Sequence, residues 1–129
     1  MAMAQPDAFD NRLAEVLAPA EERADLIICL GLFRSFRLYF GADTDAGAEA
    51  GAREVDMTVL SAVIWQGATD ATLDEAMGQI VPLSDAVTDL FSARFEANNA
   101  ATGDLFDEGL TSYLSRCDAL RIDLLEAMP

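Results

Sequence analysis

The residues of this sequence that could do chemistry are its acidic side chains, which occur in the middle of the chain without neighbouring positive charges. Between Arg53 and Arg94 there is no positively charged side chain, whereas the same stretch contains seven carboxylates. Carboxylates crowded together without neutralising arginines favour a cationic partner. The residues predicted to contact that partner are Asp70, Asp74, Asp85, Asp89, Asp104, Asp107 and Glu108.

Part of this pattern has a structural explanation. Asp74, Asp85 and Asp107 fall in the expected first turns of helices, where the positive end of the helix dipole favours negative charge. Asp85 and Asp89 are four residues apart, however, and such a like-charged pair costs about 0.2–0.5 kcal/mol on a helix. The alternative to a cationic partner is an acidic composition that reflects genomic base bias or a salty environment.

The sequence predicts no catalytic, metal or cofactor site, and so no enzyme. Histidine is absent, which excludes Ser-His-Asp and Cys-His arrangements and the usual histidine metal motifs. A calcium loop starting at Asp43 would place Asp45 at its third position and Glu54 at its twelfth. Its sixth position would then be Ala48, where the sharp turn requires glycine.

Location and redox state follow from the cysteines and the apolar stretches. Cys29 and Cys117 lie on apolar faces of expected helices, so both are expected to be free thiols that act as small hydrophobic side chains.

The N-terminal residues lack the basic region and apolar run of a signal peptide. The longest apolar stretch, 26–40, contains two arginines and falls short of the ~20 residues of a membrane span. We therefore expect a cytoplasmic protein with no membrane contact.

Composition indicates one folded domain over residues 1–129. Apolar residues make up 52% of the chain, which is too many for a disordered protein even at a net charge of −15. That charge argues against direct binding of DNA, RNA or anionic membrane, because polyanions are held by clusters of Lys and Arg.

Apolar side chains recur at helical spacing along most of the chain, which predicts an all-α, single-domain bundle of four main helices plus a short N-terminal helix. After a flexible N-terminus (1–6), the short helix covers 7–17. The four main helices are expected over 19–40, 53–66, 72–99 and from Asp104 to the end. A Gly/Ala/Asp loop is expected over 41–52.

Local signals refine this prediction. Thr72 and Glu75 form a capping box, and Pro82 is expected to kink or break the helix that follows. Asp104 is expected to cap the last helix. Val55 to Ile64 is predicted to be helical, although its β-branched residues leave a strand as the alternative.

Two further features are expected to be structural. Arg34 and Arg37 lie one turn apart, and in a chain with 23 acidic residues they are expected to pair with carboxylates inside the protein. Trp65 is the only tryptophan, and we expect it in the core and not at an interface.

These patterns predict a small, acidic, non-enzymatic protein that presents carboxylates to a basic protein surface. One concrete form is a virus-borne inhibitor that mimics nucleic acid and occupies a nucleic-acid-binding host defence protein. The first alternative is a helical oligomerisation or assembly-adaptor domain, in which the apolar stripe from Leu73 to Phe91 pairs with another helix or a second copy. The second is a bundle with a small-ligand pocket lined by Phe33, Phe36, Tyr39 and Trp65.

Overall fold

The structure, a computed structural model, describes residues 4–128 and contains only helices over that range, so the all-α prediction is confirmed. The strand alternative for residues 55–64 is excluded. In chain order, the elements are α1 (Ala4–Leu17), the 3-10 helix η1 (Ala18–Arg23), α2 (Ala24–Phe40), α3 (Asp45–Thr69), α4 (Leu73–Thr102) and α5 (Glu108–Ala127).

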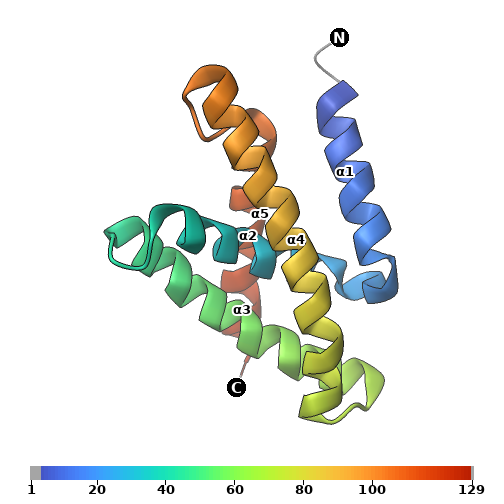
Figure 1. The fold of residues 1–129 in the computed structure, drawn as a ribbon. Coiled ribbons are helices and arrows are strands. Elements are labelled where there is room, and N and C mark those ends of the chain that lie inside the picture. Colours follow the sequence, from blue (N-terminus) through green and yellow to red (C-terminus); the bar gives the residue numbers. More distant parts are fainter. Residues whose placement is uncertain (1–3, 129) are drawn as a thin grey trace.

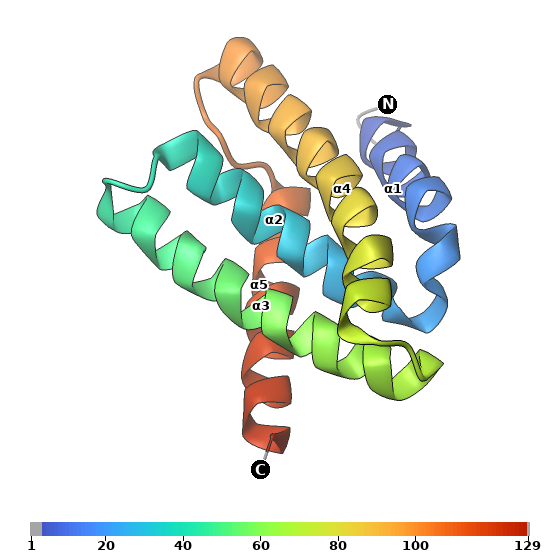
Figure 2. The same ribbon diagram turned by 60° about the horizontal axis from the view of Figure 1, so that its bottom comes forward.

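Helix α2 is the centre of the fold. It lies between α3 and α4, and α5 crosses it on a further side (Figure 1, Figure 2). Its apolar side chains are buried around most of its circumference; Ile27, Leu32 and Phe33 are at most 1% exposed. Gly31 allows α4 to approach closely, because a Cβ there would lie 2.8 Å from the Cβ of Val87. The other helices therefore have to cover α2 from several sides.

The predicted loop over 41–52 is wrong for most of its length, because α3 begins at Asp45. Thr44 caps the helix by accepting a hydrogen bond from the backbone N–H of Gly47 at 3.0 Å. Gly47 also has no room for a side chain, since a Cβ there would collide with the carbonyl of Gly41. The Thr44 cap and the close packing of Gly47 thus stabilise a helix in a segment that has few large apolar residues.

Helix α3 buries only part of its apolar surface. Met57, Leu60 and Trp65 are at most 1% exposed, which confirms the predicted core position of Trp65. Three valines of the same helix point outward, and Val55, Val59 and Val63 are 62%, 53% and 46% exposed.

Helix α4 begins with the predicted capping box between Thr72 and Glu75, which is confirmed. It then runs through Pro82 to Thr102 without the expected break. Pro82 has no N–H, so the backbone carbonyl of Gly78, four residues earlier, has no hydrogen-bond donor in the helix. Gly78 is on the exposed side of the helix, where water can donate a hydrogen bond to this carbonyl. Buried Ile80 and Ser84, on either side of Pro82, keep both turns packed on the core.

The start of α5 also differs from the prediction. Asp107, and not Asp104, is the N-terminal cap, accepting a hydrogen bond from the N–H of Leu110 at 2.8 Å. Asp104 lies in the preceding loop and accepts a hydrogen bond from the N–H of Phe106.

At the N-terminus, α1 begins at Ala4 and not at the expected residue 7, so it includes residues 4–6 of the segment predicted to be flexible; residues 1–3 of that segment lie outside the described range. The helix expected over 19–40 is divided into η1 and α2. The backbone departs from helical geometry at Glu21, inside η1, where φ is 55° and ψ is −129°.

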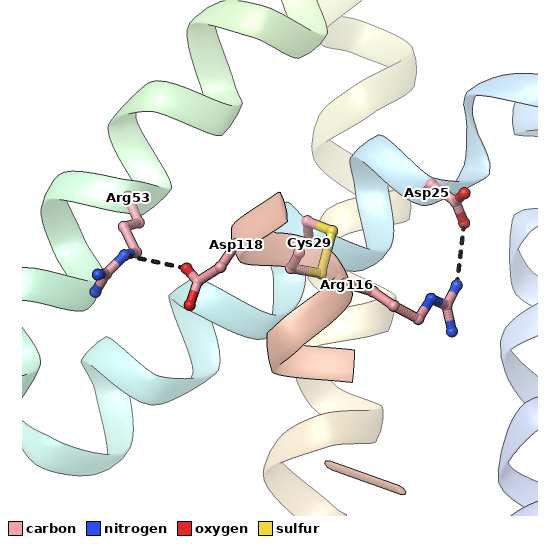
Figure 3. The surroundings of a disulfide bond; sticks show 6 residues. Asp25, Cys29, Arg53, Arg116 and Asp118 are labelled. Atoms are coloured by element: carbon pink, nitrogen blue, oxygen red, sulfur yellow. Dashed lines mark ion pairs between the residues drawn. A yellow bond between two sulfur atoms is a disulfide. The ribbon is translucent and has the colours of Figure 1, made fainter. Parts of the chain in front are cut away.

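The two cysteines are not free thiols. Cys29 of α2 and Cys117 of α5 form a disulfide, with 5.2 Å between their Cα atoms. The crossing of the two helices brings together residues that are 88 positions apart, which sequence spacing did not reveal. Figure 3 shows ion pairs on both sides of the bond, Arg53 with Asp118 at 3.3 Å and Arg116 with Asp25 at 3.7 Å. The disulfide therefore fastens α5 to the rest of the bundle.

Reduction of this disulfide is expected to lower the free energy of unfolding by about 3–4 kcal/mol, because the bond closes a long loop in the unfolded chain. Urea unfolding with and without a dithiol reductant measures the difference. A Cys29→Ala/Cys117→Ala variant should show no response to the reductant. Two titratable thiols in the denatured, unreduced wild-type chain would contradict the disulfide.

Candidate functional site

Three of the predicted partner-binding carboxylates share one face of α4. At 3.6 residues per turn, Asp74, Asp85 and Asp89 project from the same side of the helix, and Glu96 extends the row. All four side chains are exposed. At 1.5 Å per residue, the row covers about 33 Å from Asp74 to Glu96. We refer to these four residues as the α4 acidic row.

Asp85 is the member of the α4 acidic row that is bound within the protein. It accepts a hydrogen bond from Arg34 of α2 at 2.6 Å, and Arg34 is also 3.8 Å from Glu54 of α3. Arg37 donates to the same Glu54, and this bond raises the pKa of Arg37. The predicted internal pairing of Arg34 and Arg37 is thus confirmed, and it joins three helices.

The other members of the α4 acidic row have no such partner. Among the side chains that the structure describes, Asp74, Asp89 and Glu96 form no ion pair. Glu96 is not among the residues predicted from the sequence to contact a partner. It lies seven residues after Asp89, a spacing of two helical turns that could have identified it.

The remaining predicted site residues do not belong to this row. Asp70 ends α3 in a left-handed conformation, with φ of 58°. Asp104 is in the loop between α4 and α5, and Glu108 is exposed in the first turn of α5.

Asp107 has a structural role that argues against partner binding. Arg94 donates to both of its carboxylate oxygens, at 2.8 and 3.0 Å, and Asn98 donates to it at 2.9 Å. Burial alone would raise the pKa of Asp107, but these bonds and the one from Leu110 hold that pKa below its usual value. Asp107 therefore joins the end of α4 to the start of α5.

Most arginines form such ion pairs with carboxylates of the same chain. Among the described side chains, seven of the eight arginines lie within 4.0 Å of a carboxylate, and several connect different helices. With 23 acidic residues in the chain, many carboxylates are left without a positive partner. The carboxylates engaged by arginine are Glu21, Glu22, Asp25, Glu49, Glu54, Asp56, Asp85, Asp107 and Asp118.

The described residues offer no cluster of side chains suited to a metal ion. They contain no group of three or more His, Cys, Asp or Glu side chains placed to hold a metal ion. Tyr113 donates a hydrogen bond to Asp10, and burial together with this bond raises the pKa of the phenol well above its usual value. Tyr113 is therefore protonated at neutral pH and holds Asp10 of α1 against α5.

The four aromatic residues predicted to line a ligand pocket do not border a common cavity among those formed by the described residues. Phe33 and Phe36 border a cavity of about 160 Å³ between α2, α3 and α5. Trp65 borders a different cavity of about 570 Å³, and Tyr39 packs against Phe40 and Phe95. The larger cavity is considered below.

Comparisons with known proteins add no functional information. No protein-family model, curated protein or solved structure matches the chain. Between residues 4 and 128, no helix combines the length and apolar character needed to cross a membrane.

Replacing Asp107 with alanine is expected to lower the free energy of unfolding by about 2–3 kcal/mol, since it removes a helix cap and leaves the largely buried Arg94 unpaired. Because the folded-state pKa is depressed, the contribution of Asp107 is present above the unfolded pKa of ~3.9 and is lost as the pH falls through the folded value. Urea unfolding between pH 3 and 7 measures both effects. Asp104→Ala, in the same loop, is the control. An equal loss of unfolding free energy in both variants would contradict the role of Asp107 as helix cap and partner of Arg94.

Proposed function

We propose that this chain is a small, non-enzymatic binding protein that presents the α4 acidic row to a basic surface on a partner protein. The observation that carries the proposal is the row itself, in which Asp74, Asp89 and Glu96 are exposed on one helical face and form no ion pair with any side chain that the structure describes. Partner arginines or lysines would relieve the repulsion between these carboxylates and bind through complementary charge.

A more specific form of the proposal is nucleic-acid mimicry, in which the row occupies the phosphate-binding groove of a nucleic-acid-binding protein. The length of the row supports it, because about 33 Å matches one turn of duplex DNA, about 34–36 Å. Its charge density gives weaker support. Four carboxylates occupy a length over which one DNA strand has about ten phosphates, at 3.4 Å spacing. A virus-borne inhibitor that occupies a nucleic-acid-binding host defence protein is one example of such a mimic.

Self-association is a second candidate, through a different surface from the one expected. The predicted stripe on α4 is not available, since Ile80, Val87 and Phe91 are fully buried in the chain's own core. The exposed apolar row on α3 favours this candidate, because Val55, Val59 and Val63 follow one another at four-residue intervals on the outer face.

The disulfide indicates the kind of cellular compartment in which this function would operate. Disulfides persist in oxidising compartments and are rare in the cytosol, where thiols are kept reduced. The bond between Cys29 and Cys117 therefore favours an oxidising setting over the cytoplasm expected from the sequence.

A charge-matched pair of variants tests the proposed function. Asp74→Asn/Asp89→Asn/Glu96→Gln removes three charges from the α4 acidic row, and Glu15→Gln/Asp43→Asn/Glu126→Gln removes three exposed charges elsewhere. Binding is measured by titration calorimetry with a deca-arginine peptide and with a panel of purified nucleic-acid-binding proteins. The α4 variant is expected to bind about tenfold or more weakly, and the control variant nearly as well as wild type.

Salt dependence completes this test. For three to four charge contacts, affinity should fall on the order of 10- to 100-fold between 50 and 200 mM salt. Equal weakening in both variants would mean that net charge, and not the row, drives binding, and would contradict the proposal. Light scattering on the free chain addresses the second candidate, which requires a dimer that dissociates in a Val59→Asp variant.

A further inference from the structure

The larger cavity described above lies where η1, the C-terminal end of α3 and the first half of α4 meet. Its volume of about 570 Å³ is within the range of small-molecule sites. Pro19 of η1 and Pro82 and Leu83 of α4 form apolar walls, and Arg23, Trp65 and Gln79 also line it. None of these residues belongs to the α4 acidic row, so the cavity is a separate feature.

Arg23 is a buried cation with weak partners. Its side chain is only 9% exposed, and its guanidinium carbon lies 4.6 Å from the centre of the Trp65 ring. Its carboxylate partners are its own neighbours in sequence, Glu22 at 3.2 Å and Glu21 at 3.9 Å, whose side chains are more than 70% exposed. Its Nε has no hydrogen-bond partner among the described residues. Since solvent-exposed ion pairs contribute little, this buried charge is incompletely compensated.

Gln79 adds a second donor to the same cavity. Its side-chain oxygen accepts a hydrogen bond from the indole N–H of Trp65 at 2.6 Å. This bond fixes the orientation of the amide, because the indole N–H can only donate. The Gln79 amide nitrogen is then left without a partner among the described residues. The hydroxyl of Thr69, also in the lining, is already donated to the Trp65 carbonyl.

Backbone strain occurs at this same place. Glu21, which lines the cavity, has φ of 55° and ψ of −129°, a conformation that residues with a side chain rarely adopt. Such conformations cost about 1–3 kcal/mol and tend to occur where a site requires them. Here the strained turn lies directly before Arg23 and places the Glu21 carboxylate near the guanidinium.

From these observations we infer that the cavity binds a small organic carboxylate with an apolar body. The ligand's carboxylate replaces the exposed Glu22 at the Arg23 guanidinium, whose planar fork suits a carboxylate, and the Gln79 amide donates a further hydrogen bond. The apolar body lies against Pro19, Pro82 and Leu83. A single negative charge is required, because the neighbouring carboxylates of Glu21 and Glu22 repel a multiply charged phosphate.

Trp65 provides a direct readout, since it is the only tryptophan and gives a single indole N–H resonance in a ¹H–¹⁵N spectrum. Titration of the full chain with benzoate is expected to shift this resonance saturably, with a Kd of about 1 mM or tighter. Acetate, which lacks the apolar body, should bind more weakly, and inorganic phosphate should cause no saturable shift. The absence of a saturable shift with benzoate would overturn the inference.

Variants assign the effect to the cavity. Gln79→Glu keeps an acceptor for the Trp65 N–H but adds a negative charge, and should weaken benzoate binding about fivefold or more. Asn11→Asp adds the same charge on α1 and should leave binding unchanged. Glu22→Gln removes the competing carboxylate and should tighten binding about two- to fivefold. Equal effects of Gln79→Glu and Asn11→Asp would overturn the inference. The partner-binding test on α4 is independent of this result.

Discussion

The enclosure of α2 is the constraint on which the rest of the structure depends. Its side chains are buried around most of its circumference, so water has to be excluded from several of its sides. The apolar faces of α3, α4 and α5 are used for this purpose. Even its buried Ser35 is satisfied within the helix, by donating a hydrogen bond to the carbonyl of Leu32 at 2.7 Å.

The same enclosure determines where the positive charges go. Arg34 and Arg37 lie near the C-terminal end of α2, where they reach carboxylates on α3 and α4. Arg53 and Arg121 similarly connect α3 with α5. Because most arginines connect helices in this way, only Arg34 reaches the α4 acidic row, where it pairs with Asp85. The other three carboxylates of the row are left without an arginine among the described side chains, as a consequence of where the few positive charges lie in the fold.

Residues that act through local rules were predicted well from the sequence. The capping box of Thr72 and Glu75, the core position of Trp65 and the pairing of Arg34 and Arg37 depend on short spacing, burial tendency or charge balance. Periodicity alone did not show which apolar face of α3 would be buried. The outward position of Val55, Val59 and Val63 became clear only from the structure.

Features that depend on how distant segments meet could not be predicted. The Cys29–Cys117 disulfide and the contact of Arg23 with Trp65 exist only because helices far apart in sequence cross. The segment 45–52 was expected to be a loop because glycine and alanine offer little surface to bury. Small side chains are what its close approach to α2 requires.

Repulsion among the surface carboxylates is expected to outweigh the internal ion pairs, because 23 acidic residues face only eight arginines. The free energy of unfolding in urea, measured in about 0.01 and 0.15 M sodium chloride, tests it most directly, because the screening length falls from about 30 to 8 Å over this range. If unpaired carboxylates dominate, the added salt relieves their repulsion and the free energy of unfolding rises. A fall over the same range would mean that the ion pairs dominate, and would contradict the account.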